Sequence, residues 1–136
     1  MEKNFTHAKQ ILSYRHDSVK SGTKMIDKEE IVISLKTSSK DRMGKIFLDK
    51  LLMQKFAEHP VKVVGIFLND VQRKETKQIG FTFVSGLFMV YTKFLTQLEG
   101  VYFIDPPPIT QGNPYNQHIF PFSQFIAADI WKLLSP

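Results

Sequence analysis

The sequence predicts a single α/β domain, residues 1–136, with a mixed, mostly parallel sheet flanked by helices. A chain of 136 residues can build one hydrophobic core and is short for two. Hydrophobic residues make up 43% of the chain, and twelve residues are Phe, as expected for a folded globule. The predicted elements alternate as strand, helix, strand, helix and strand, an order that requires crossovers between parallel strands.

The first part of the chain leads into the predicted sheet. Residues 3–14 can form an amphipathic helix, and the turn-rich passage after it predicts a hairpin before a strand at residues 31–36. Successive side chains of a strand point to opposite faces, so Ser34 and Lys36 are expected on one face and Ile33 on the other.

The central helix and strand follow from capping and hydrophobicity. Ser38 or Ser39 can serve as the N-cap of a helix that runs to about His59, where Pro60 ends it. Residues 61–68, "VKVVGIFL", are nearly all apolar and rich in β-branched side chains, which predicts a strand covered on both faces. A polar connection comes next.

The last part of the chain predicts two helices and a strand. Residues 84–98 form a helix that is apolar around much of its circumference, with Gly100 at its C-terminal side, so this helix is expected in the core or in a subunit interface. Residues 101–104 form a short strand that ends at three prolines. A rigid surface loop and a helix capped by Ser123 complete the chain.

Composition excludes several classes of protein. The absence of cysteine excludes disulfides, thiol catalysis and Cys-ligated zinc, and fits a reducing compartment. No run of eighteen apolar residues occurs, and the first fifteen residues lack a signal-peptide core. We therefore expect a cytoplasmic protein that does not interact with a membrane.

The positive charge is concentrated in the middle of the chain. Residues 36–77 contain ten Lys and Arg against five acids, whereas residues 1–35 contain six against five and residues 78–136 two against three. Either this segment forms a solvated basic face, or it binds a polyanion whose phosphates the cations neutralise.

Four residues at the end of the first predicted strand and the start of the next helix predict a phosphate-binding site. Ser34 and Lys36 share a face near the C-terminal end of their strand, where open α/β sheets usually place their sites. Lys40 and Arg42 lie at the start of the following helix, whose exposed backbone N–H groups also attract anions.

Asp49 adds a carboxylate to this segment. It lies in the predicted helix among mainly apolar neighbours such as Ile46 and Met53, and an acid in such a stripe needs a partner. One interpretation is an ion pair within the helix, with Lys45 or Arg42. The other is a carboxylate that faces the polar side of the preceding strand, where it could hold a divalent cation beside bound phosphate.

Three blocks of the sequence carry a family resemblance: "ISLKTSSKDRMGKIFLDK", "VVGIFLNDVQRK" and "FVSGLFMVYTKFLTQLEGVYFIDPPP". Together and in this order they resemble the ScaI-like type II restriction endonucleases of the PD-(D/E)xK nuclease superfamily, over most of residues 17–134. The resemblance implies a restriction-endonuclease-like core, cleavage of double-stranded DNA with Mg²⁺, and a homodimer acting on a palindromic site.

The resemblance also implies roles for individual residues. In the superfamily, one acid and a second acid two positions before a lysine coordinate Mg²⁺. Ser34 stands where the second acid is expected, but one branch of the superfamily uses a carboxylate on the next helix instead. Asp49, thirteen residues after Lys36, matches this displaced carboxylate. Lys36 matches the catalytic lysine, and Lys40 and Arg42 match a basic pair of the same branch.

The first acid is assigned to Asp17 in "YRHDSVK", nineteen residues before Lys36, although His16 replaces the usual preceding proline. Asp27 and the pair Glu29 and Glu30 are alternatives that look more like a hairpin tip. The predicted metal ligands are therefore Asp17 and Asp49.

Predicted DNA contacts are cations and amides from two segments that leave the same edge of the sheet. These residues are Lys40, Arg42, Lys45, Asn69, Gln72, Arg73 and Lys74. An ordinary polar loop is the alternative for the second segment. Two further hypotheses for the whole chain are a non-catalytic DNA-binding or assembly protein derived from such a nuclease, and a repair-type nuclease of the same fold. The domain could also lack an N-terminal portion of a longer enzyme.

Overall fold

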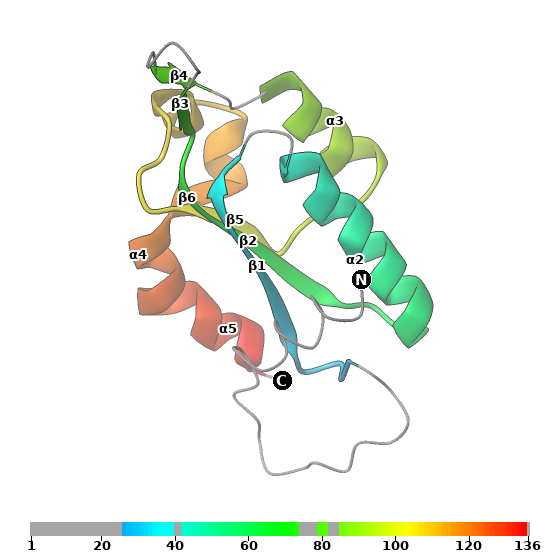
Figure 1. The fold of residues 1–136 in the computed structure, drawn as a ribbon. Coiled ribbons are helices and arrows are strands. Elements are labelled where there is room, and N and C mark those ends of the chain that lie inside the picture. The colour runs from blue at the N-terminus through cyan, green and yellow to red at the C-terminus, as the bar shows by residue number, and fades with distance from the viewer. Residues whose placement is uncertain (1–25, 40–41, 74–78, 82–84, 136) are drawn as a thin grey trace.

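A four-stranded parallel sheet forms the centre of the computed structural model, which describes residues 26–39, 42–73, 79–81 and 85–135 (Figure 1). Its strand order is β1-β2-β5-β6, and all three neighbouring pairs are parallel. The strands are β1 (Ile31–Ser38), β2 (Lys62–Asn69), β5 (Gly100–Phe103) and β6 (Ile119–Pro121). The predicted mostly parallel α/β fold is confirmed.

Helices cover both faces of this sheet (Figure 1). On one face lie α2 (Met43–Ala57) and α3 (Ser85–Phe94). α2 connects β1 to β2, and α3 precedes β5. On the other face lies a C-terminal helical segment made of α4 (Phe122–Gln124), a π-helical turn (Phe125–Asp129) and α5 (Ile130–Leu134). Two 3₁₀ turns, η1 (Pro108–Gln111) and η2 (Tyr115–Gln117), lie between β5 and β6.

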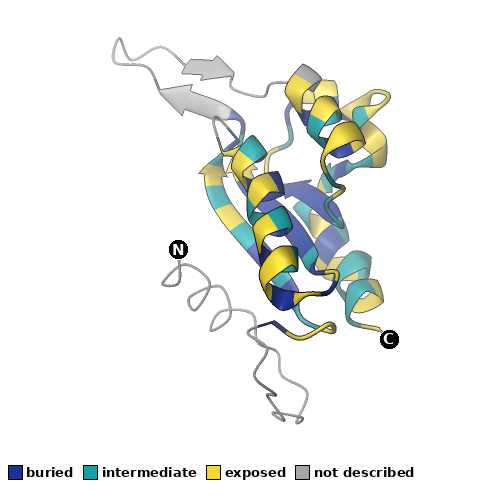
Figure 2. Ribbon diagram, turned by 90° about the vertical axis from the view of Figure 1, so that its right-hand side faces the viewer, coloured by how far each residue is buried: buried dark blue, intermediate teal, exposed yellow. Residues whose placement is uncertain are grey.

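The core consists of one apolar cluster on each face of the sheet. Toward α2 and α3, the rings of Phe47 and Phe88 meet edge to face with centroids 5.9 Å apart. Toward the C-terminal helical segment, Ile33, Val64 and Phe125 belong to a second cluster. Because side chains alternate along a strand, β2 contributes to both clusters. Figure 2 shows the resulting band of buried residues through the sheet.

A buried tyrosine joins the sheet to the C-terminal helical segment. The Tyr102 hydroxyl donates a hydrogen bond of 2.9 Å to Oδ2 of Asp129, and the Gln124 side-chain amide donates to the same oxygen at 3.0 Å. Burial raises the pKa of Tyr102, and the Asp129 carboxylate raises it further. The hydroxyl therefore stays protonated when a tyrosine in water would ionise.

Replacement of Tyr102 by Phe tests this contact through the pH dependence of stability. At neutral pH, loss of the hydrogen bond should lower the free energy of unfolding by about 1 kcal/mol. Above about pH 10, the unfolded chain releases the tyrosine proton while the folded chain retains it, so wild-type stability should fall as the pH rises. Urea titrations between pH 8 and 11 should therefore give a shallower decline for Tyr102→Phe. Equal slopes would contradict the assignment.

The two helices of one face pack closely and leave an apolar surface outside. A Cβ at Gly44 of α2 would lie 2.9 Å from Cε2 of Tyr91 in α3, so glycine permits this approach. We call the outward large hydrophobic side chains of the two helices the outer apolar face. Its residues are Leu48, Leu52, Phe56, Leu87, Val90 and Phe94, which are between 38% and 79% exposed. α3 is thus only partly buried: Phe88 and Thr92 are buried, whereas Leu87, Val90 and Phe94 are exposed.

Several predicted boundaries are wrong. α2 begins at Met43 after Arg42, and neither Ser38 nor Ser39 caps it: Ser38 is the last residue of β1, and the Ser39 hydroxyl donates to Asp70 instead. α3 ends at Phe94 rather than at residue 98. The reason for the early end is that the following residues return to the sheet, where the Glu99 N–H bonds to the Val63 carbonyl.

Three further differences involve strands and the last helix. The polar connection after β2 contains β3 (Val71–Arg73) and β4 (Ile79–Phe81), which pair antiparallel. The predicted loop after the prolines ends in β6, whose partner β5 satisfies its backbone groups. The last helix begins at Phe122, after extended Pro121, so Ser123 is not its cap. The predicted helix at residues 3–14 lies outside the described residues, and no helix within them could span a membrane.

Candidate functional site

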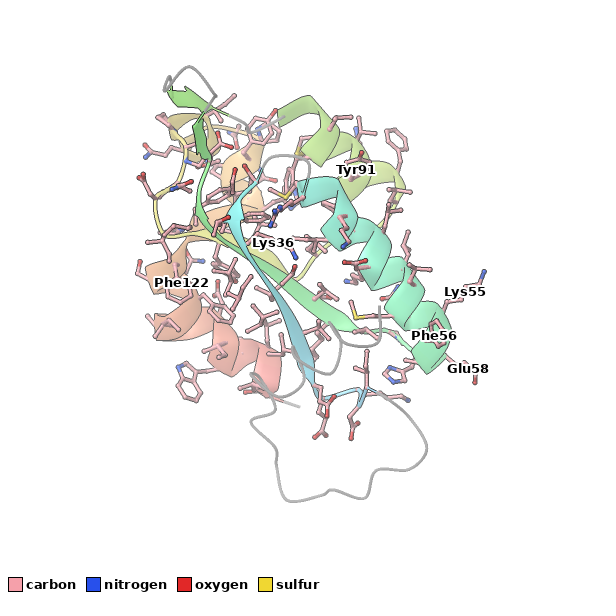
Figure 3. The ribbon with its side chains drawn as sticks, in the orientation of Figure 1. Lys36, Lys55, Phe56, Glu58, Tyr91 and Phe122 are labelled. Carbon is pink, nitrogen blue, oxygen red and sulfur yellow. The ribbon has the colours of Figure 1, made fainter. Side chains whose placement is uncertain are left out.

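Lys36 lies near the C-terminal end of β1, on the side that faces α2 (Figure 3). Val32, four residues earlier on the same face, packs against the cluster beneath α2. Lys36 and Ser34 are half-buried. Among the described residues, the Lys36 ammonium has no hydrogen-bond or ion-pair partner. A half-buried cation without such a partner is available for an anionic ligand.

Asp49 and Arg42 lie on the flank of α2 that faces away from α3. Gly44 contacts α3 and marks the opposite flank, with the buried stripe of α2 between the two. Asp49 follows Arg42 by seven residues, two helical turns, so both share one flank. The ring of Phe88 in α3 meets His118, which directly precedes β6, so α3 lies toward β5 and β6 and the opposite flank of α2 lies toward β1. Asp49 is half-buried and Arg42 is exposed.

Not every lysine of the basic segment is available for a ligand. Lys50 is buried and donates to both carboxylate oxygens of Glu99, at 2.8 and 3.0 Å. Glu99 in turn accepts the backbone N–H of Val63, so this ion pair fixes the beginning of β2 beside β5. Lys62 similarly donates to the Leu133 carbonyl. These two lysines stabilise the fold, at the end of the sheet opposite Lys36.

A pair of lysine-to-methionine variants separates these roles. Lys50→Met leaves Glu99 without its cation and should lower the free energy of unfolding by about 2–3 kcal/mol, less than for a fully buried pair because Glu99 is partly exposed. Lys36→Met removes no observed contact and should change it by less than about 0.5 kcal/mol. Chemical denaturation of both variants measures the difference. If Lys36→Met lowered the free energy of unfolding as much as Lys50→Met, Lys36 would be a residue that stabilises the fold.

The predicted Mg²⁺ site is partly within the described residues. Mg²⁺ in proteins usually takes one or two carboxylates and keeps several waters. Asp49 offers one carboxylate on the flank of α2 toward β1, and Ser34 offers a neutral hydroxyl on β1. No group of three or more His, Asp or Glu that could hold a metal occurs in the described part of the chain. Asp17, the second predicted ligand, lies outside it.

The other predicted DNA-binding residues are in segments that follow the C-terminal ends of β1 and β2. Lys45 is exposed on α2, and half-buried Asn69 pairs with Ser38 at the end of β2. Gln72 and Arg73 lie in β3, whose first residue, Val71, directly follows Asp70 in the sequence. Figure 1 shows β3 and β4 above this edge of the sheet. Lys40 and Lys74 lie outside the described residues.

Sequence reasoning missed a buried polar pair at this edge. Ser39 follows β1 directly, Asp70 follows β2 directly, and the Ser39 hydroxyl donates to Oδ1 of Asp70. Both residues are only 3% exposed. The available signal was an acid immediately after a strand predicted to be buried on both faces. The hydroxyl was instead assigned to helix capping, because the sequence does not reveal which acceptor lies nearest.

Comparison with known proteins identifies the fold of this arrangement. Neither a protein-family model nor a curated protein matches the sequence. Among solved structures, the crystal structure of the type IIP restriction endonuclease Kpn2I matches with a TM-score of 0.70 and 18% sequence identity. The match covers 98% of this chain and 45% of that one. The chain has a restriction-endonuclease-like fold. The chain spans less than half the length of Kpn2I. The narrower resemblance to ScaI-like enzymes stays a prediction.

Proposed function

We propose that the protein is a Mg²⁺-dependent type II restriction endonuclease that hydrolyses phosphodiester bonds in double-stranded DNA at a specific, palindromic site. The observation that carries the proposal is Lys36: a half-buried cation with no partner among the described residues, on the face of β1 toward α2. The Kpn2I-like fold and the resemblance of the sequence blocks support the same activity. Unlike that of Lys50, the Lys36 ammonium bonds to no group in the part of the chain that the structure describes.

Each residue of the site meets a demand of phosphodiester hydrolysis. Negative charge grows on the phosphate during attack, and the Lys36 ammonium stabilises it electrostatically. Arg42 can bind a phosphate through two parallel hydrogen bonds and Lys40 as a point charge, so both would fix the backbone of the duplex. Asp49 and Asp17 would hold Mg²⁺, which lowers the pKa of bound water and supplies the nucleophile.

Recognition of DNA would extend beyond the cleaved phosphate. Asn69 is the last residue of β2, Gln72 and Arg73 are in β3, and Lys74 follows them in the sequence. Amide and basic residues are the types that bind base edges and phosphates. Lys45, which is exposed on α2, would add a phosphate contact. These contacts would select the site, while the cations set the overall affinity.

Plasmid cleavage tests the activity. In Mg²⁺ buffer, the wild type should cut mixed-sequence plasmid into discrete fragments, and Lys36→Met or Asp49→Asn should each lower the rate by at least about 100-fold. Lys28→Met is the matched control, because Lys28 is exposed just before the opposite end of β1. Far-ultraviolet circular dichroism should show that all three variants are folded.

Other cleavage results identify the alternatives. A smear in place of discrete fragments would indicate a repair-type nuclease without a fixed recognition sequence. Intact DNA that the protein retains in a salt-sensitive manner would indicate a non-catalytic DNA-binding or assembly protein. Wild-type rates for Asp49→Asn would remove Asp49 from the metal site.

A homodimer is part of the proposal, because a palindrome presents two equivalent strands to two equivalent sites. The outer apolar face supports this pairing, since exposed large hydrophobic side chains on two neighbouring helices are typical of an interface.

Light scattering tests the dimer. The wild type, with a chain mass of 15.7 kDa, should give twice that mass at micromolar concentration, and Leu52→Glu or Val90→Glu should restore the monomer mass by placing a charge in the interface. Lys28→Glu is the charge-changing control and should remain dimeric. A monomeric wild type, both free and with DNA, would refute the homodimer.

A further inference from the structure

The buried hydrogen bond between Ser39 and Asp70 joins two segments that leave the sheet. Ser38 and Asn69 are register partners at the ends of β1 and β2, so Ser39 and Asp70 are the first residues beyond this paired edge. The Ser39 hydroxyl donates to Asp70 across it. Parallel strands diverge beyond their last pair unless other contacts hold them together, and here a side-chain bond does so.

Ser39 also determines where α2 begins. Its backbone carbonyl accepts the N–H groups of Arg42 at 3.4 Å and Met43 at 3.2 Å. Met43 is buried in the core, whereas Arg42 is exposed. One residue thus bonds through its side chain to the end of β2 and through its backbone to the start of α2. The position of Arg42 therefore depends on Ser39.

Asp70 has the equivalent place on the other segment. It is the one residue between Asn69 at the end of β2 and Val71 at the start of β3. The β3–β4 ribbon, which contains Gln72 and Arg73, begins directly after it. The Ser39–Asp70 bond consequently connects the start of α2 with the base of the ribbon, the two segments that carry the predicted DNA contacts.

We propose that Ser39 and Asp70 form a positioning pair that holds the start of α2 and the β3–β4 ribbon at a fixed separation, so that both bind the same DNA duplex. Neither residue touches DNA, because both side chains are buried. The inference rests on the proposed function, since it assigns the pair to DNA recognition. It deepens that function by explaining how contacts from separate segments reach one ligand together.

Salt-dependent DNA binding distinguishes this role from one in stability alone. The probe is a fluorescent, mixed-sequence duplex of about 30 base pairs, measured without Mg²⁺ over a range of salt concentrations. Ser39→Ala and Asp70→Ala should each weaken binding about 10-fold and reduce the slope of log K against log salt by about one to two, as phosphate contacts of one segment are lost. Asp70→Asn keeps an oxygen acceptor for the Ser39 hydroxyl and should bind like wild type.

The outcomes separate the positioning role from the proposed function. A role in stability alone would lower the unfolding midpoint of the alanine variants but leave the salt slope of the folded protein unchanged, and that result would overturn the proposal. Either alanine variant that remains folded is decisive. Arg42→Gln is the control for DNA binding: if it lowers the slope while both alanine variants keep the wild-type slope, the positioning role fails and DNA binding stands. If the wild type does not bind the duplex, the proposed function itself fails.

Discussion

Burial of β2 on both faces is the constraint on which the rest of the structure depends. Five consecutive residues, 63–67, are buried, so this strand requires helices above and below the sheet as well as a strand on each side. α2 and α3 satisfy this requirement on one face and the C-terminal helical segment on the other. β2 is central, and β1 lies at the edge of the described sheet. The C-terminal ends of both strands therefore lie at the edge of the sheet from which the chain continues into α2.

Two polar pairs among the described residues lie at opposite ends of this sheet. At the beginning of β2, the Lys50 and Glu99 ion pair satisfies buried charges and holds neighbouring strands. At the other end, the Ser39 hydroxyl donates to Asp70, and the Lys36 ammonium has no hydrogen-bond or ion-pair partner among the described residues. The first end stabilises the fold, whereas the second presents a cation together with the polar segments that a nucleic-acid site would use.

Local patterns were informative where one side-chain property decides the structure. The alternation of Ile31, Val32 and Ile33 correctly assigned the faces of β1, and the apolar run in β2 correctly predicted a strand covered twice. Prediction failed where several partners compete for the same group. Ser39 could cap a helix or bond to a distant acid, and burial beside Asp70 decided between them. β6 was missed because three residues carry too little periodicity.

The sequence by itself determined the α/β class, the central buried strand and the placement of Lys36 near a strand end, because these follow from periodicity and hydrophobicity within one segment. It also placed Arg42 and Asp49 two helical turns apart. Only the tertiary structure decided which flank of α2 faces β1, which lysines the fold uses, and that Asp70 lies against Ser39. These facts depend on contacts between residues distant in the chain, and local side-chain pattern does not specify such partners.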